Sequence, residues 1–315
     1  MSNILNKQII IIAGPCSVNK NSLNELFRIA DIRVINSSNK RQRAIWGLRV
    51  VGLKSRTNMN DAGEGMGLDF REYLRNVDIV ASGKTMNDFK MLPSIEIARR
   101  LVEKTGLTVA TEIVNPIIQL PLYEKLIPEN KLLIWNPAVN QLGYPMHIMG
   151  IYAKRNGWFI GIKNGKWFGE NSGEKLNGME KNWVGQISYA AQDKRTLLRD
   201  RIIMIHRGVD VAGKGKFRQA PVHDSTEKIK KITKLKMFFD PSHSLGHLLR
   251  DQIVEQTISA MQIKTSSGDY LYDGILIEAG TSKTDTEQHI IVKELQNLCE
   301  KISKFRDIVS PDNQQ

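Results

Sequence analysis

The stretch Ile9–Val18, IIIIAGPCSV, joins a run of branched apolar residues to a Gly14-Pro15 turn that carries a cysteine. Branched apolar side chains favour a buried β-strand, and Gly and Pro favour the turn that ends it. Neither element needs a thiol. Because cysteines outside disulfides often serve as small buried apolar residues, Cys16 has a structural as well as a functional interpretation.

The same pattern, a short apolar run followed by a helix-like segment or loop, occurs eight times along the chain. The predicted strands are Ile9–Ala13, Ala44–Val51, Thr108–Ile113, Lys131–Trp135, Trp158–Ile162, Ile202–His206, Met237–Asp240 and Gly274–Glu278. The predicted helices include Ser22–Ile35, Pro93–Thr105, Pro116–Leu126, Pro145–Asn156, Gly246–Ile263 and Thr286–Phe305. Eight parallel strands joined by right-handed crossovers predict an α/β fold, a single (β/α)8 TIM barrel over residues 1–315.

Two Gly-rich segments are predicted to be loops. An open α/β sheet would carry a glycine fingerprint after its first strand, but the segment Gly63–Gly67, GEGMG, follows no predicted strand. Residues 166–183, rich in Gly and Asn, are predicted to be a loop insert that forms a lid or a surface loop.

The bulk composition is that of an ordinary globular protein. The chain has 315 residues, 41% hydrophobic and 25% charged. Its two cysteines, Cys16 and Cys299, lie too far apart in sequence to suggest a disulfide framework, which favours a reducing compartment. No signal-peptide pattern and no apolar run of about 18 residues is present. We therefore expect a cytoplasmic protein with no membrane partner.

The net charge of +12 favours partners that carry negative charge, such as phosphorylated substrates, anionic surfaces or nucleic acid. The one dense cluster, Glu227–Lys236 (EKIKKITKLK), is typical of a solvated helix face. No zinc-knuckle spacing or RNP-like aromatic pattern accompanies it, so no nucleic-acid partner is predicted.

In a (β/α)8 barrel the chemistry takes place at the C-terminal ends of the strands, and here two groups of side chains lie there. One group is cationic and predicts binding of phosphate groups: Lys54, Arg56, Lys163 and Arg207. The other combines a thiol, an imidazole and two carboxylates, and suits one divalent ion such as Mn, Fe, Co or Zn: Cys16, His243, Glu278 and Asp285. Each residue also has a structural alternative, as a turn, surface or ion-pair residue.

Seven motifs resemble those of the class I 3-deoxy-D-arabino-heptulosonate 7-phosphate (DAHP) synthases and occur in the same order. They are AGPCSV, LKSRT, TEI, IKNG, IHRG, FDPSHS and GILIEAG, and KFRQAP (Lys216–Pro221) is a further match. The resemblance spans roughly Ile9 to Ile291. It implies a barrel that condenses phosphoenolpyruvate with erythrose 4-phosphate and releases phosphate, the first step of the shikimate pathway and of aromatic amino-acid biosynthesis.

The resemblance also implies roles for individual residues. The metal ligands would be Cys16, His243, Glu278 and Asp285. Substrate would be bound by Lys54, Arg56, Lys163 and Arg207. The catalytic residues would be Cys16, Lys54, Glu112 and His243, with Glu112 or Lys54 positioning a water or a proton. Such barrels usually assemble as homo-oligomers, dimers or tetramers.

The chain departs from the family's pattern in three places. Ser55 replaces the proline of the family's K-P-R-T motif, and only six residues separate Glu278 from Asp285. The family's Gly-Ala-Arg after strand four is replaced by Trp135–Gln141, WNPAVNQ, which has no arginine. Candidates to replace that arginine are Lys166 and Arg218.

Two alternatives to a DAHP synthase stay open. The Pro137-Ala138 turn resembles that of the sister 3-deoxy-D-manno-octulosonate 8-phosphate synthases, which use arabinose 5-phosphate as the acceptor. The missing arginine and the insert at 166–183 also fit a barrel that keeps a binding role without catalysis.

Overall fold

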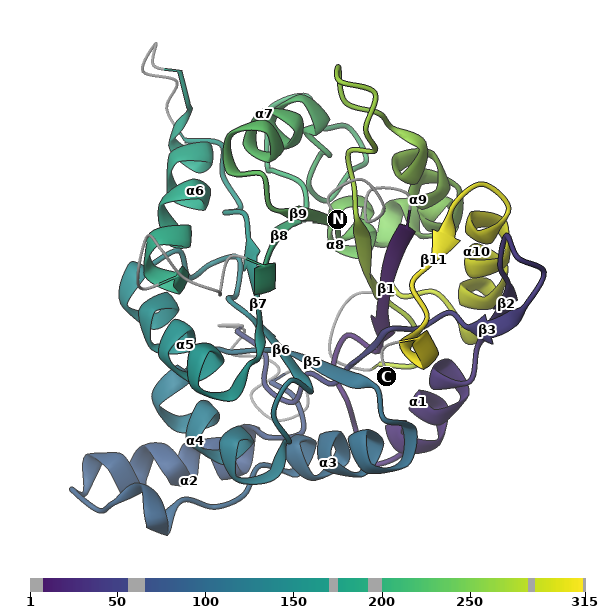
Figure 1. The fold of residues 1–315 in the computed structure, drawn as a ribbon. Coiled ribbons are helices and arrows are strands. Elements are labelled where there is room, and N and C mark those ends of the chain that lie inside the picture. The colour runs from purple at the N-terminus through teal and green to yellow at the C-terminus, as the bar shows by residue number, and fades with distance from the viewer. Residues whose placement is uncertain (1–7, 56–65, 170–174, 192–199, 283–286, 314–315) are drawn as a thin grey trace.

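The computed structural model describes residues 8–55, 66–169, 175–191, 200–282 and 287–313, and these form a closed parallel barrel surrounded by helices (Figure 1). The barrel strands of this part of the chain are β1 Gln8–Gly14, β4 Gly47–Arg49, β5 Thr108–Glu112, β6 Leu132–Trp135, β7 Phe159–Lys163, β8 Ile202–His206, β9 Lys236–Phe239 and β10 Gly274–Glu278. They pair in sequence order, and β10 closes the barrel on β1 with Ile10 opposite Gly274. The predicted fold class and all eight predicted strands are confirmed.

The alternation of side chains along each strand separates two apolar layers. In β1, Ile9 and Ile11 belong to the large cluster that joins strands to helices, whereas Ile12 belongs to a smaller cluster that fills the barrel interior. The members of this interior cluster are Ile12, Trp46, Val51, Ala110, Leu133, Trp135, Ile203, Ile205, Phe238 and Leu276. The interior of the barrel is therefore a packed core and not a channel.

The helices connect the strands on the outside of the barrel (Figure 1). Their bounds are α1 Ser22–Ala30, α2 Phe70–Ala81, α3 Pro93–Thr105, α4 Pro116–Leu126, α5 Gly143–Asn156, α6 Gly178–Ala191, α7 His223–Thr233, α8 Pro241–Leu245, α9 Ile253–Gln262 and α10 Val292–Ser303. Short 3-10 turns lie at η3 Met86–Asp88, η5 His247–Gln252 and η6 Pro311–Asn313. The predictions for α3 and α4 are confirmed residue by residue, because a proline at the first helical position fixes each start.

Three helix predictions were too long. The helix expected over Thr286–Phe305 is α10, which begins only at Val292 and ends at Ser303. The helix expected over Ser22–Ile35 ends at Ala30, and Arg33–Ile35 instead forms strand β2, which pairs antiparallel with β3, Arg41–Arg43. The branched Val34 and Ile35 favour a strand as soon as a partner is present. The segment expected as one helix over Gly246–Ile263 is divided, because Leu249 has non-helical backbone angles.

The predicted loop insert at 166–183 is wrong in its last six residues, because α6 begins at Gly178. Asn177 Oδ1 accepts a hydrogen bond from Glu180 N, and Glu180 Oε2 accepts one from Asn177 N. This reciprocal pair is a capping box that starts the helix despite its glycine and asparagine content. The other Gly-rich segment, Gly63–Gly67, lies mostly outside the described residues.

The C-terminal segment lies at the opposite end of the barrel, where the strands begin. β11, Asp307–Ile308, adds to β1, and the buried Arg306 donates hydrogen bonds to the backbone oxygens of Met261, Tyr272 and Gln8. The two cysteines, both described, form no disulfide. In the part of the chain that the structure describes, no helix is long and apolar enough to cross a membrane.

Asp69, just before α2, makes the stability of the fold depend on pH. Burial raises the pKa of its carboxyl from 3.8 to about 6, although Ser94 donates two hydrogen bonds to it. Since the folded pKa lies above the unfolded one, this group stabilises the fold below about pH 4, and that contribution is lost as the pH rises to about 6. We expect the free energy of unfolding to fall by roughly 3 kcal/mol over this interval because of Asp69.

Urea unfolding of wild type and Asp69→Asn at several pH values between 4 and 8 measures this effect. The amide does not titrate, so the free energy of unfolding of the variant should depend less on pH between about pH 4 and pH 6. Identical slopes for the two proteins would contradict the assignment.

Candidate active site

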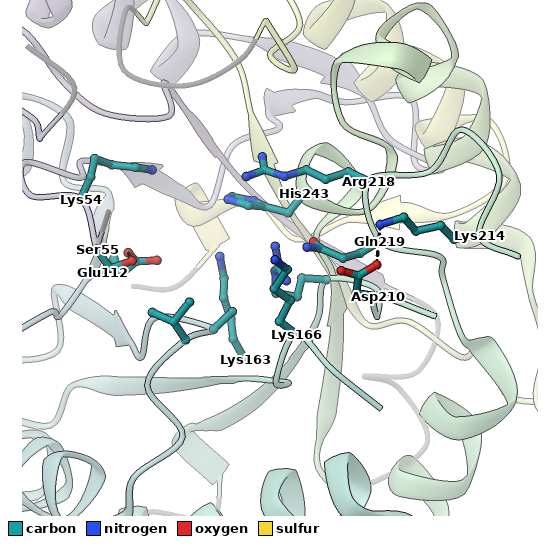
Figure 2. A pocket seen from close by; sticks show the side chains of 13 residues that line it. Lys54, Ser55, Glu112, Lys163, Lys166, Asp210, Lys214, Arg218, Gln219 and His243 are labelled. Carbon is teal, nitrogen blue, oxygen red and sulfur yellow. Dashed lines mark hydrogen bonds and ion pairs between the residues drawn. The ribbon is translucent and has the colours of Figure 1, made fainter. Parts of the chain in front are cut away.

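A cavity of about 360 Å³ opens at the C-terminal ends of the barrel strands and is predominantly cationic (Figure 2). Its positive lining side chains are Lys54, Lys163, Lys166, Arg207, Lys214 and Arg218. The carboxylates that line it are Glu112 and Asp210, and His243 and Gln219 complete its polar part. Figure 2 shows Lys54, Lys163 and His243 pointing into this space from different sides. Such a surplus of cations suits a ligand with several negative charges.

Cys16 lies two residues beyond β1, beside the cavity, where Lys54 Nζ contacts its Sγ at 3.0 Å. The end of β1 approaches β4 so closely that Gly14 has no room for a side chain. A Cβ at Gly14 would lie 2.4 Å from the carbonyl oxygen of Arg49. Burial by itself would lower the pKa of Lys54, but Cys16 and two nearby carboxylates raise it. The thiol is therefore held against a charged ammonium group, an environment that favours a thiolate.

Arg49 ends β4 inside the barrel and pairs with Glu278 at the end of β10. The distance from Arg49 Nη2 to Glu278 Oε1 is 2.8 Å, and both side chains are buried. The same Nη2 donates to the carbonyl oxygen of Cys16 at 3.3 Å, and the guanidinium lies over the ring of Trp135. Arg49 thus joins the ends of three strands around the floor of the site.

Asp240 orients both His243 and Lys163. It follows β9 directly, and its carboxylate lies 2.9 Å from His243 Nδ1 and 3.0 Å from Lys163 Nζ. Burial and Lys163 lower the pKa of His243, although Asp240 acts in the opposite direction, so the imidazole is neutral at neutral pH. With Nδ1 bonded to Asp240, Nε2 faces Glu278 Oε1 at 3.7 Å.

Glu112 ends β5 and faces the cavity as a carboxylate. Burial would raise its pKa, but the charges of Lys163 and Lys54 outweigh burial, and the pKa is lowered. Trp135 Nε1 donates to its Oε2 at 3.3 Å and Ser55 Oγ to its Oε1 at 3.4 Å. Because it is ionised at neutral pH, Glu112 can accept a proton or a hydrogen bond but cannot act as an acid.

Most of the residues predicted from the sequence come together in this structure. Those that line the cavity are Lys54, Glu112, Lys163, Arg207 and His243. Cys16 and Glu278 lie behind it, linked to Lys54 and His243. Arg56 and Asp285 lie outside the described residues, so their roles stay predictions from the motifs.

The residues of the site that were not predicted include Arg49, Asp240 and Gln288. Arg49 stands in the apolar run GLRVVG. A charged residue in a buried strand is rarely there without a partner, so its presence in this run could have marked it as a site residue. Asp240 belongs to the DPSHS motif and could have been assigned as the partner of His243. Gln288, which donates from Nε2 to Glu278 Oε2 at 2.7 Å, left no comparable signal in the sequence.

The donor side chains fit a divalent metal ion in part. Two ligands of one such ion lie roughly 3–4 Å apart, as His243 Nε2 and Glu278 Oε1 do at 3.7 Å. Asp240 on the opposite ring nitrogen is the usual outer partner of a metal-binding histidine. Within the described residues, however, no three Cys, His, Asp or Glu side chains are grouped closely enough to hold an ion. The four-ligand site with Asp285 therefore stays a prediction.

Comparison with known proteins gives a structural match. No protein-family model matches the chain, and no curated protein matches its sequence. Among solved structures, the phospho-2-dehydro-3-deoxyheptonate aldolase (DAHP synthase) of Thermotoga maritima is similar, with a TM-score of 0.65 and 18% sequence identity. The match covers 96% of this chain and 72% of that one. The chain therefore has a DAHP synthase-like (β/α)8 fold, in agreement with the resemblance of its motifs.

Proposed function

We propose that this protein condenses phosphoenolpyruvate with erythrose 4-phosphate and releases inorganic phosphate, as a DAHP synthase does. The observation that carries the proposal is the cavity with six positive side chains beside the buried pairs of Cys16 with Lys54 and of His243 with Asp240. Both substrates are phosphorylated anions. A site that holds two of them together must supply more positive than negative charge, and this one does.

The residues at neighbouring strand ends divide the binding between them. Lys163 at the end of β7 and Arg207 directly after β8 bind the phosphate of phosphoenolpyruvate, Arg207 through its fork of donors. Asn164 Oδ1 accepts from Arg207 N at 2.8 Å and fixes the start of this loop. Lys54, with Arg56 of the same motif, binds the second substrate. Holding both anions in reactive contact can contribute several kcal/mol to the rate.

In the reaction, C3 of phosphoenolpyruvate forms a bond to the aldehyde carbon of the sugar phosphate. Water adds to C2, the bond between C2 and the phosphate oxygen breaks, and inorganic phosphate leaves. Glu112 is ionised and accepts one proton of the attacking water, whereas Lys54 is charged and donates a hydrogen bond to the aldehyde oxygen as negative charge develops there. The proton removed from the water is returned to this alkoxide, and the second proton of the water leaves with the phosphate as the C2 carbonyl forms. One divalent ion, held by Cys16, His243, Glu278 and Asp285, would supply Lewis-acid polarisation of that aldehyde.

One observation favours a second acceptor. The turn after β6 places Ala138 and Val139 at the cavity, where the family has an arginine, and its Pro137-Ala138 sequence resembles the sister synthases. Arabinose 5-phosphate, one carbon longer than erythrose 4-phosphate, is therefore the alternative substrate.

A phosphate-release assay distinguishes these possibilities. With phosphoenolpyruvate and erythrose 4-phosphate we expect release of one phosphate per molecule of product, loss of activity after treatment with a chelator, and recovery on adding Mn²⁺ or Zn²⁺. Turnover with arabinose 5-phosphate alone would assign the sister activity. Binding of phosphoenolpyruvate without turnover of either aldehyde, with metal present, would identify a barrel that has lost catalysis.

A further inference from the structure

The positive charge of the cavity is concentrated on one side. The turn after β6 contributes Ala138 and Val139, whereas the loops after β7 and β8 contribute Lys166, Lys214 and Arg218. A phosphate group held by the residues at the ends of β7 and β8 would therefore meet apolar side chains on one flank and cations on the other.

The backbone of Arg218 is fixed against the segment that carries His243. Arg218 N donates to Leu245 O at 3.1 Å, and the following residue, Gln219, donates from N to Ser244 O at 3.0 Å. Gly246 permits this contact, because a Cβ there would lie 2.6 Å from the Cβ of Arg218. The position of Arg218 is thus set by the same short helix, α8, that places the imidazole in the site.

The side chain of Arg218 is aimed by Gln288. Arg218 Nη1 donates to Gln288 Oε1, and Gln288 Nε2 donates to Glu278 Oε2 at 2.7 Å. Gln288 is completely buried. Because an amide accepts through oxygen and donates through nitrogen, these two bonds define one orientation of its side chain. The bond to Gln288 orients the guanidinium, and Figure 2 shows Arg218 pointing into the cavity beside His243.

The neighbouring lysines differ in their partners. Lys214 Nζ forms an ion pair with Asp210, and Lys163 Nζ lies 3.0 Å from Asp240. Lys166 Nζ lies over the ring of Trp167, 5.1 Å from its centre. Among the described cations of this flank, Arg218 combines a fork of donors with a buried residue that orients it, and a fork of donors is what a phosphate group binds best.

We propose that Arg218 binds the phosphate group of the enolpyruvate substrate together with Lys163 and Arg207, and that Gln288 is its positioning residue. This inference rests on the proposed function for the identity of the substrate. The binding of a phosphate group by Arg218 is testable without turnover.

Calorimetric titration with inorganic phosphate and with phosphoenolpyruvate, in sulfate-free buffer, tests the proposal. A charge-assisted hydrogen bond contributes about 1.5–3 kcal/mol, so Arg218→Gln should weaken binding of both ligands roughly ten- to a hundredfold. Arg218→Lys keeps the charge but loses the fork and should give an intermediate affinity. Gln288→Leu leaves Arg218 charged but not aimed, and should also weaken binding of both ligands.

The matched control is Arg100→Gln on the exposed face of α3, which should bind both ligands like the wild type. Wild-type affinity in Arg218→Gln, folded by circular dichroism, would overturn the proposal, as would a wild-type protein that binds neither ligand. If phosphate binding depends on Arg218 but neither aldehyde is turned over, the phosphate site stands and the proposed condensation fails.

Discussion

The Cys16→Ser variant is expected to bind a divalent metal ion roughly a hundredfold more weakly than the wild type, or worse, while keeping its fold. Loss of an outer partner of a metal ligand already weakens binding about ten- to a hundredfold, and loss of a ligand should cost at least as much. Serine has nearly the shape of cysteine, and its hydroxyl can still accept a hydrogen bond from Lys54. The fold should therefore survive, whereas a neutral hydroxyl is a far poorer ligand than a thiolate for a borderline ion.

Equilibrium dialysis against Mn²⁺ or Zn²⁺ followed by metal analysis gives the affinity, and thermal unfolding reports the fold. The chain supplies its own matched control in Cys299, the second cysteine. Cys299 is buried in the apolar face of α10, and burial raises its pKa to about 12. Cys299→Ser should keep the metal and the condensation activity. Equal metal affinity in wild type and Cys16→Ser would remove Cys16 from the ligand set.

The barrel could be predicted because local sequence and global topology agree at each strand. Ile202–His206 and Gly274–Glu278 have the bounds that their apolar runs predict, since buried parallel strands need continuous branched residues. The elements that were missed depend on partners elsewhere in the chain. The strand Arg33–Ile35, for example, forms only because Arg41–Arg43 returns beside it as an antiparallel partner.

The site could be predicted where a residue stands at a strand end within a distinctive motif. Lys163 and His243 were identified in this way, and both face the cavity. Gln288 could not be found by this rule, because it follows β10 by ten residues and acts through its contacts with Arg218 and Glu278. The contacts of Gln288 depend on how side chains pack across the barrel mouth. That packing cannot be predicted from a single sequence.

Arg49→Met is expected to destabilise the fold by about 3–5 kcal/mol, because it leaves the carboxylate of Glu278 buried without its cation. Arg49 and Glu278 are 1% and 0% exposed, so water cannot solvate the remaining charge. The pair also joins β4 to β10 across the barrel. Within the described residues Arg49 Nε and Nη1 have no hydrogen-bond partner, so the ion pair with Glu278 is the main compensation for burying this guanidinium.

The double variant Arg49→Met/Glu278→Gln should recover much of the lost stability, because it removes both charges together. The exposed pair of Arg75 with Glu72 is a matched control, since its closest contact is also 2.8 Å but Arg75 is 50% exposed. Arg75→Met should change the free energy of unfolding by less than about 1 kcal/mol. Urea unfolding of the four proteins at pH 7 measures these differences. If Arg49→Met lost no more stability than Arg75→Met, the buried ion pair would contribute no more to the free energy of unfolding than the exposed pair does. The coupling of β4 to β10 would then have to come from apolar packing alone.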